Sequence, residues 1–464
     1  MKQHMPLGYG KWIRLPLMGM LGLISLAIFP LAPGWTQEKG VKVLTREEAL
    51  RIGLEKNKDI KKAQEYRNSV MGRYVEERSA ALPQLQLSGG YSRDRDDATS
   101  KLFHGFFPPE KETWGTEVGV SQLIYSFGRV GAAIRAAKIG LSTAEDQLRI
   151  YQQAALRDVS SAFDDVLLAK EIYALALQNY DQKVRIQDET RRKHAAGVAT
   201  DYDVLAADVA VENARPEVIR RENQIRLTRE RLRFLLGLEG EEVDAKGTFE
   251  ETITPYPSYE TGVDTAWKSR PDLSDLQKRI GIAVELVKIN DAGDKPRVDL
   301  KGSYGYRDIN YFDVARGDGQ VWSAGVFLTF PFFDGMRSRG KTIQAKSDLS
   351  SLKIDEAKMK DSIALQVRDA LNACREAEEI VKALSGTVRQ AEKLLSMAEK
   401  GYEYGVKTKL EVDDAQLSVI QAKGNLARAR RDYSVARVTL DWVLGTVGEN
   451  NQPKAISDQL SAKK

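Results

Sequence analysis

The sequence predicts a mixed α and β membrane protein that is built from two internal repeats and is completed by several copies of the chain. Three observations predict this class. First, the tract from Gly197 to Asp208 recurs from Gly405 to Gln416, an offset of 208 residues. Second, each half contains two segments of about 10 residues in which apolar and polar residues alternate, the length of a tilted membrane-spanning strand. Third, each half contains a long proline-free segment with an apolar residue at every seventh position.

The composition fits a large globular protein or a membrane β-barrel. The chain has 464 residues, a formal net charge of +4 and 42% hydrophobic residues. This charge is too small to favour nucleic acid as a partner. The single cysteine, Cys374, excludes an internal disulfide framework. Its place in the seven-residue apolar pattern predicts a packed side chain rather than a reactive thiol.

Residues 1–34 are predicted to be a secretory signal peptide. Lys11 and Arg14 precede an apolar run from Leu15 to Ala32, and small residues follow at Ala32-Pro33-Gly34. The alternative is an uncleaved N-terminal anchor, which the prolines and glycines of the run disfavour. Beyond this segment no apolar run reaches the roughly 18 residues of a membrane-spanning helix, so entry into a membrane would require strands.

Four further segments follow the signal peptide. We expect a first structural repeat at residues 35–238, a polar connector at 239–262, a second repeat at 263–447 and a polar tail at 448–464. The first repeat is expected to open with a helix from about Thr45 to Ala81. Thr45 and Glu48 have the spacing of a capping box, and Pro83 ends the helix.

Each repeat is expected to contain two strands that a loop connects. In the first repeat the strands are predicted at Leu85–Tyr91 and Trp114–Phe127, and the loop between them carries an aromatic patch at Phe103–Phe107. In the second repeat one strand is predicted after Pro296 and another from Trp322 to Phe330, around a polar loop at 308–320.

Very long helices are expected after each strand pair. A helix from Arg129 to about Ala195 would be about 100 Å long at 1.5 Å per residue. The seven-residue steps are Ile134, Leu141, Leu148, Ala155, Ala162 and Ala169 in the first repeat, and Val367, Cys374, Val381, Val388, Leu395 and Tyr402 in the second. Such steps predict coiled-coil seams that need partner helices.

Four strands per chain cannot close a barrel in lipid by themselves. The backbone groups of their outer edges would stay unpaired in hydrocarbon, at a cost of several kcal/mol each. A closed barrel therefore requires several chains: two copies give eight strands and three give twelve. The apolar helix seams require partners in the same way, so the sequence predicts a homo-oligomer with a strand barrel continued by a helical tube.

The chain resembles the TolC-type outer membrane efflux protein family. Three duplicated features carry the resemblance: the turns Gly197-Val198-x-Thr200 and Gly405-Val406-x-Thr408, the helix ends Leu236-Gly237 and Leu444-Gly445, and the corners Tyr125-Ser126-Phe127-Gly128 and Phe333-Asp334-Gly335. The resemblance implies a homotrimer with a trimeric 12-stranded β-barrel in the outer membrane of a Gram-negative bacterium, continued by a long α-helical coiled-coil barrel in the periplasm.

The resemblance also implies a function and partners. The chain would be a passive exit duct of a tripartite efflux or type I secretion system. It would work with a periplasmic adaptor and an inner membrane transporter of the RND, ABC or MFS type. The cargo stays open between small organic compounds, metal ions and polypeptides. The alternative is a periplasmic coiled-coil scaffold or adaptor without a membrane barrel, which would explain the heptads but not the strand pairs.

The turns at Gly197 and Gly405 are the first candidate site. Glycine permits a left-handed turn, and Thr200 and Thr408 can cap the helices that follow. On the residues alone these are helix-hairpin turns. The resemblance implies that the exposed tips dock the adaptor, with Val198 and Val406 as the apolar contacts.

An acidic pair after the second turn is the candidate gate. Glu411 and Asp414 share one helix face, and Asp203 is the counterpart of Glu411 in the first repeat. The ordinary alternative is a solvated helix face. The resemblance implies a ring of carboxylates at the periplasmic entrance, in which like charges raise one another's pKa and attract cations.

Side chains beside the second turn are candidates for ties between neighbouring hairpins. The resemblance points to Tyr402 and Lys407, with Tyr202 and Asp203 as partners. A single exposed tie contributes little, but several around a ring could hold the tip closed.

The predicted strands carry four aromatic residues that are candidates for an interfacial belt: Trp114, Tyr304, Tyr306 and Trp322. Packing within the barrel is the alternative for them. The sequence contains no catalytic set, no phosphate-binding loop and no metal-ligand spacing. We therefore expect neither enzymatic activity nor a cofactor.

Overall fold

The computed structural model of the chain describes residues 41–102, 108–249, 255–312 and 315–448. The predicted signal peptide, the aromatic patch at Phe103–Phe107 and the tail from residue 449 lie outside these residues. No helix among the described residues is both long enough and apolar enough to span a membrane.

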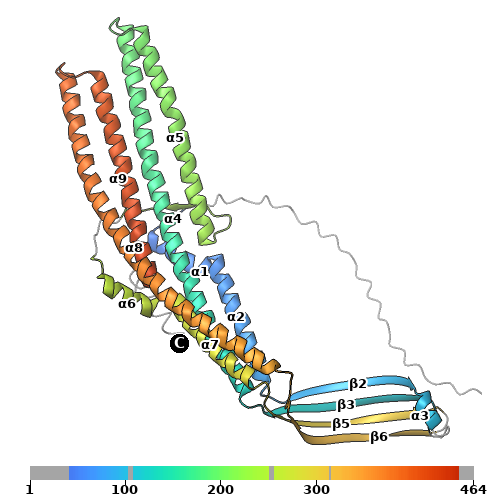
Figure 1. Ribbon diagram of the computed structural model, residues 1–464. Helices are drawn as coiled ribbons and strands as arrows, with labels where there is room; N and C mark the ends of the chain where they lie inside the picture. Colours follow the sequence, from blue (N-terminus) through green and yellow to red (C-terminus); the bar gives the residue numbers. More distant parts are fainter. Residues whose placement is uncertain (1–40, 103–107, 250–254, 313–314, 449–464) are drawn as a thin grey trace, which may run out of the picture. The chain divides into compact units, whose positions relative to one another are not determined.

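The first half contains three helices shorter than those of the hairpin, two long strands, two short strands and a long helical hairpin (Figure 1). Its elements are β1 (Lys42–Leu44), α1 (Arg46–Lys56), α2 (Lys58–Ser79), β2 (Gln84–Arg95), α3 (Asp97–Leu102), β3 (Glu110–Tyr125), α4 (Arg129–Ala195), α5 (Asp201–Leu236) and β4 (Val243–Ala245). The long helix α4 begins and ends where the sequence predicts. It contains 67 residues.

The second half repeats this plan. Its elements are α6 (Tyr259–Ser269), α7 (Pro271–Asp291), β5 (Arg297–Tyr311), β6 (Ala315–Thr329), α8 (Arg337–Glu403) and α9 (Lys409–Leu444). Helix α8 has 67 residues like α4, and α9 has 36 residues like α5. The starts of these helix pairs are separated by the 208 residues of the sequence repeat.

The helix expected from Thr45 to Ala81 is two helices, which is a correction. The predicted capping box at Thr45 and Glu48 is present. Asn57 then interrupts the helix because its side chain has three backbone partners. Its Oδ1 accepts from the amides of Asp59 and Ile60, and its Nδ2 donates 2.8 Å to the carbonyl of Leu235.

The four long strands form one antiparallel sheet in the order β2-β3-β5-β6. They contain 12 to 16 residues and so exceed the expected length. The loop expected at 308–320 is a further correction, because pairing continues to Tyr311 opposite Ala315. Polar cross-strand contacts hold this extension: Arg316 pairs with Asp308 at 2.6 Å, and Tyr306 donates to Asp318.

The connector is less irregular than its composition suggests. Its strand β4 pairs in parallel with β1, so that Lys42 lies opposite Val243. Asp244 of β4 accepts 2.8 Å from Lys170 of α4 and 3.0 Å from Arg229 of α5. These contacts bind the segment between the repeats to the first helical hairpin.

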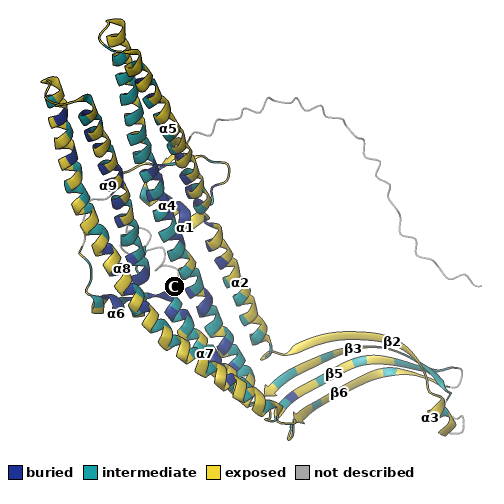
Figure 2. Cartoon of the chain, turned by 45° about the horizontal axis from the view of Figure 1, so that its top comes forward, coloured by how far each residue is buried: buried dark blue, intermediate teal, exposed yellow. Residues whose placement is uncertain are grey.

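Each helical hairpin is packed on its own apolar cluster, and the two clusters obey the repeat. Phe163, Leu232 and Leu236 are buried in the first cluster, and their counterparts Leu371, Leu440 and Leu444 are buried in the second. Cys374 lies fully buried in the second cluster, which confirms its predicted packing, and burial raises the pKa of its thiol to about 11. Figure 2 shows that buried residues are concentrated midway along the hairpins and that the turns are exposed.

Buried polar contacts join the two halves near these clusters. The Asp164 carboxylate of α4 is fully buried and accepts from Arg46 of α1 and, at 2.7 Å, from Ser434 of α9. One residue further on, Asp165 is paired with Arg431 of α9 at 2.7 Å. Helix α9 is therefore fastened to α4 by polar as well as apolar contacts.

Candidate functional site

The two hairpin turns have the same backbone geometry. Gly197 and Gly405 adopt left-handed conformations with φ of +75° and +74°. The amide of Val198 donates 2.8 Å to the carbonyl of Lys193, and the amide of Val406 donates 2.8 Å to that of Gly401. These bonds close the last turn of α4 and of α8. Backbone hydrogen bonds within each turn therefore stabilise the chain reversal without help from side chains.

The turns present apolar side chains to solvent. Val198 and Val406 are 77% and 78% exposed. Three larger residues beside them are also exposed: Tyr202, Tyr404 and Leu410. The backbone of the turns is satisfied without these side chains, so they are free to contact another molecule.

Thr200 and Thr408 cap the helices that follow the turns, as the sequence predicts. Each threonine forms a capping box with the residue three positions on, Asp203 in α5 and Glu411 in α9. Asp203 accepts 2.8 Å from the Thr200 amide, which is the largest cause of its lowered pKa. The Asp203 carboxylate therefore caps the start of its own helix.

The two acids of the predicted gate have different roles within one chain. Glu411 accepts 2.5 Å from the Lys407 ammonium and 2.8 Å from the Thr408 amide, and these contacts lower the pKa of Glu411 to about 2. Asp414 is exposed, and among the described residues its carboxylate has no ion-pair partner. Of these two acids, only Asp414 is without an ion-pair partner among the described residues.

Within one chain, Lys407 and Tyr402 contact residues that were not among the candidate partners. The Lys407 ammonium pairs with Glu411 of α9, and the Thr200 capping box engages Asp203. Tyr402 of α8 instead lies near Lys193 of α4. The pKa of Lys193 is raised, first by its hydrogen bond to Glu189 and to a smaller extent by the Tyr402 hydroxyl.

A second contact between the hairpins lies close by. The Lys183 ammonium of α4 is 3.9 Å from Oδ1 of Asp413 in α9, and that buried oxygen has no hydrogen-bond partner among the described residues. No sequence pattern indicates a role for Lys183, Lys193 or Asp413. Their pairing depends on how the two hairpins pack, and no spacing within either repeat encodes that packing.

The sheet has two unlike faces. One face, which we call the apolar face, carries exposed large apolar side chains: Leu85, Leu87, Tyr91, Trp114, Val118, Val120, Leu300, Tyr304, Tyr306, Trp322, Val326 and Leu328. The opposite face, which we call the polar face, consists of glycine, hydroxyl, amide and charged residues at most of the alternate positions. A solvent-exposed sheet of a water-soluble protein would not bear so many large apolar groups on one side.

The four predicted aromatic residues all lie on the apolar face. Tyr304 is directly opposite Trp322, and the rings of Trp114 and Tyr306 meet edge to face with centroids 6.2 Å apart. By the strand register they occupy three successive rows of this face. They therefore form an aromatic band rather than scattered positions.

The described residues contain no cluster of three His, Cys, Asp or Glu residues placed to hold a metal ion. The geometry of the candidate sites is that of turns, ion pairs and two sheet faces.

Comparison with known proteins agrees with this geometry. The family model described as outer membrane efflux protein matches residues 50–238 and 262–446. The outer membrane protein TolC of Vibrio cholerae is 25% identical over 388 residues, which cover 81% of this chain and 84% of that protein. The alkaline protease secretion protein AprF of Pseudomonas aeruginosa is 24% identical and covers 80% of this chain and 78% of its own length.

Solved structures share the fold. The CmeC outer membrane channel of Campylobacter jejuni has a TM-score of 0.77 at 16% identity and covers 90% of this chain and 89% of its own. A membrane protein of Pseudomonas aeruginosa has a TM-score of 0.74 at 23% identity, with 86% and 93% covered. Since the family model matches both repeats and most of the chain, the protein belongs to the outer membrane efflux protein family.

Proposed function

We propose that three copies of this outer membrane exit duct join their sheets into a twelve-stranded barrel. The observation that carries the proposal is the two-faced sheet, whose outer strands pair on one side only. Among the described residues β2 is paired with β3 alone and β6 with β5 alone. In lipid these edges require a neighbour, and β2 of one copy beside β6 of the next closes a ring.

The apolar face of each sheet then contacts lipid and the polar face surrounds the passage. The aromatic band fits the headgroup level of the membrane, where tyrosine and tryptophan are enriched. The long hairpins of three copies continue as an α-helical coiled-coil barrel in the periplasm, where their partly buried helix seams find partners. Residues 1–34 act as the export signal, residues 239–262 connect the repeats, and residues 448–464 form a tail.

The turns at Gly197 and Gly405 dock a periplasmic adaptor, which links the duct to an inner membrane transporter of the RND, ABC or MFS type. The support is the exposed apolar side chains of Val198 and Val406 on turns that are complete without them. An adaptor that contacts only these two valine side chains would leave the capping boxes intact.

The periplasmic entrance is gated by Asp414 and by two contacts between the hairpins. Three Asp414 carboxylates form the charged ring, because Glu411 is held by Lys407 and by its helix cap. The Lys183–Asp413 and Lys193–Tyr402 contacts hold the two hairpins of one chain together near the tip. Each contact is weak, so adaptor binding can release them.

The oligomer and the passage are tested together with purified mature protein. We expect light scattering in detergent to give the protein mass of three chains, and planar bilayers to show discrete conductance steps. A monomer that stays in solution without detergent and yields no steps would refute the barrel and favour the periplasmic scaffold.

The gate is tested with one double variant and one control. Lys183→Ala with Tyr402→Phe should raise single-channel conductance, because both contacts between the hairpins are removed. Lys407→Ala is the control, since the Lys407 ammonium pairs with Glu411 within the same hairpin and the change should leave conductance closer to that of the wild type. Equal conductance of the double variant and the wild type would contradict the gate.

A further inference from the structure

The polar face contains an arginine that lacks a partner. The strand register places Gly90, Gly115, Arg307 and Gly319 in one row across the sheet. Among the described residues no hydrogen bond or ion pair engages the guanidinium of Arg307. The other arginines of the sheet have carboxylate partners: Arg93, Arg95, Arg297 and Arg316.

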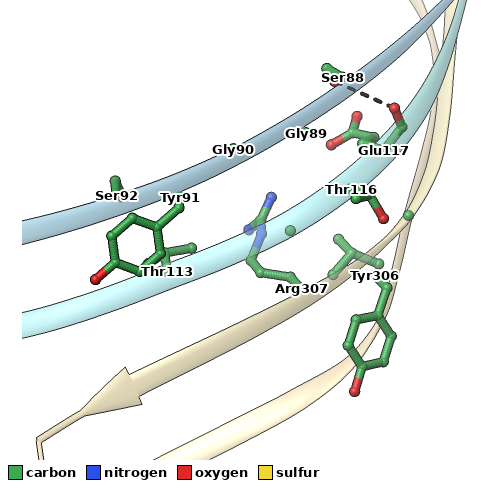
Figure 3. A pocket seen from close by; sticks show the side chains of 13 residues that line it. Ser88, Gly89, Gly90, Tyr91, Ser92, Thr113, Thr116, Glu117, Tyr306 and Arg307 are labelled. Carbon is green, nitrogen blue, oxygen red and sulfur yellow. Dashed lines mark hydrogen bonds between the residues drawn. The ribbon is translucent and has the colours of Figure 1, made fainter. Parts of the chain in front are cut away.

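The space around Arg307 is open. A hollow of about 370 Å³ in the sheet is lined by Arg307 and by neighbours on all four strands, among them Ser92, Thr113 and Glu117. Figure 3 shows the Arg307 side chain extending across β3 towards Gly90, whereas the Tyr306 ring points away from it. A Cβ atom at Gly90 or Gly319 would meet nothing within 4 Å, so packing does not explain why side chains are lacking there.

One acid, Glu117, also lines the hollow but does not pair with Arg307. Glu117 lies on the adjacent strand, opposite Gly305 and one row away, yet no ion pair joins it to Arg307. A Cβ at Gly305 would come within 2.3 Å of the Thr116 carbonyl, so β3 and β5 are closely apposed at this point. The two opposite charges therefore share the hollow without contact, and the guanidinium fork stays available.

We propose that Arg307 is an oxyanion-binding residue of the duct, which receives carboxylate, phosphate or sulfate groups of solutes as they pass. The planar guanidinium offers paired N–H donors that match two oxygens of such a group. The hydroxyl of Thr113 lines the same hollow and supplies a further donor, whereas the Ser92 hydroxyl donates to Asp94. Three copies of the chain place three such sites at one level of the barrel.

This inference rests on the proposed function, because Arg307 faces the passage only if the sheets close with the apolar face outwards. The site is too open for tight binding. Its effect is to raise the local concentration of anions and to favour solutes that carry an oxyanion. Glu117 in the same hollow would suit a cationic group on such a solute, so zwitterions are accommodated as well.

The test uses the full-length mature protein in planar bilayers of lipid without net charge. No anionic headgroup then competes with dissolved anions for Arg307. The reversal potential in a potassium chloride gradient gives the ratio of chloride to potassium permeability. For Arg307→Gln we expect this ratio to fall about four- to sixteen-fold. One charge roughly 5 Å from the ion path in water changes the local chloride concentration about two- to four-fold and changes the local potassium concentration about as much in the opposite direction. Arg316→Gln removes the same charge near the apolar face and should leave the ratio unchanged.

Sulfate and a conservative variant separate oxyanion recognition from simple charge. Inorganic sulfate should reduce chloride current through the wild-type channel, and Arg307→Gln should relieve the reduction. Arg307→Lys should keep the chloride ratio but lose most of the sulfate effect, because lysine lacks the planar fork. An unchanged ratio in Arg307→Gln, or a full sulfate effect in Arg307→Lys, overturns the inference and leaves the duct intact. A wild-type protein that forms no channel overturns the duct and the site together.

Discussion

Replacing Val326 by lysine should prevent the protein from assembling in a membrane, whereas the same change at Val321 should be tolerated. Both valines lie in β6, five positions apart, and therefore on opposite faces of the sheet. Val326 belongs to the apolar face and is 69% exposed in the single chain. Val321 lies in the polar face beside the hollow of Arg307 and is 38% exposed.

The magnitude follows from the position of the charge. A lysine on the lipid face of a β-barrel costs about 2–4 kcal/mol at the bilayer midplane and about 0–1 kcal/mol near the interfaces. Val326 lies opposite Leu300, two rows beyond the row of Tyr304 and Trp322, and so outside the aromatic band. Three copies would multiply the midplane cost to about 6–12 kcal/mol per trimer, comparable with the whole stability of a folded domain.

The assay compares the amount of heat-modifiable trimer in the outer membrane fraction for the two variants. We expect Val326→Lys to yield little or no trimer and Val321→Lys to yield nearly the wild-type amount. Equal yields from the two variants, or a greater loss with Val321→Lys, would refute the assignment of the two faces and with it the barrel.

Three further predictions concern the helices. Gly237→Ala should lower the thermal unfolding temperature in detergent more than Gly405→Ala. Both glycines have positive φ, which costs about 1–2 kcal/mol for alanine. A Cβ at Gly237 would also lie 2.4 Å from the Lys56 carbonyl, whereas a Cβ at Gly405 would meet nothing within 4 Å. Asp164→Ala should reduce the free energy of unfolding in urea by about 3–5 kcal/mol, because it leaves the largely buried Arg46 without its carboxylate partner. Glu239→Ala is the control: Glu239 is the exposed partner of the exposed Lys58, and its removal should have no measurable effect. The pKa of Glu411 is lowered from 4.5 to about 2, so the stability that its carboxylate gives to the second turn is present above pH 4.5 and is lost as the pH falls to about 2. Hydrogen exchange of the amides of residues 401–415, corrected for its intrinsic pH dependence, should show this loss of stability in the wild type and not in Glu411→Gln.

The long helices and the turns could be predicted from the sequence because local signals determine them. An uninterrupted heptad pattern without proline leads to α4 between the predicted ends, and threonine with an acid three residues later produces each capping box. Because the same pattern occurs in both repeats, each helix and turn is predicted twice. The outer strands were predicted in the right places but too short, because their ends carry charged residues whose cross-strand partners are invisible in a single segment.

Features that depend on distant partners could not be predicted. The break at Asn57 depends on a hydrogen bond to Leu235, 178 residues later, and the strand at Val243–Ala245 depends on pairing with Lys42–Leu44. In the candidate gate the sequence identified Tyr402 but not Lys193, its neighbour across the hairpins. The Lys407–Glu411 pair within one chain was not predicted either, although a lysine four residues before a glutamate at a helix start is a local signal for it.

The equal lengths of the paired helices limit how such a protein can change during evolution. Helices α4 and α8 both have 67 residues, and α5 and α9 both have 36. A four-residue insertion in α4 alone would displace its turn by about 6 Å from the turn of α8 and shift Lys193 by one helical turn from Tyr402. Viable insertions and deletions are therefore confined to matched events in all four helices, and unpaired length changes must accumulate in the segments that link the strands.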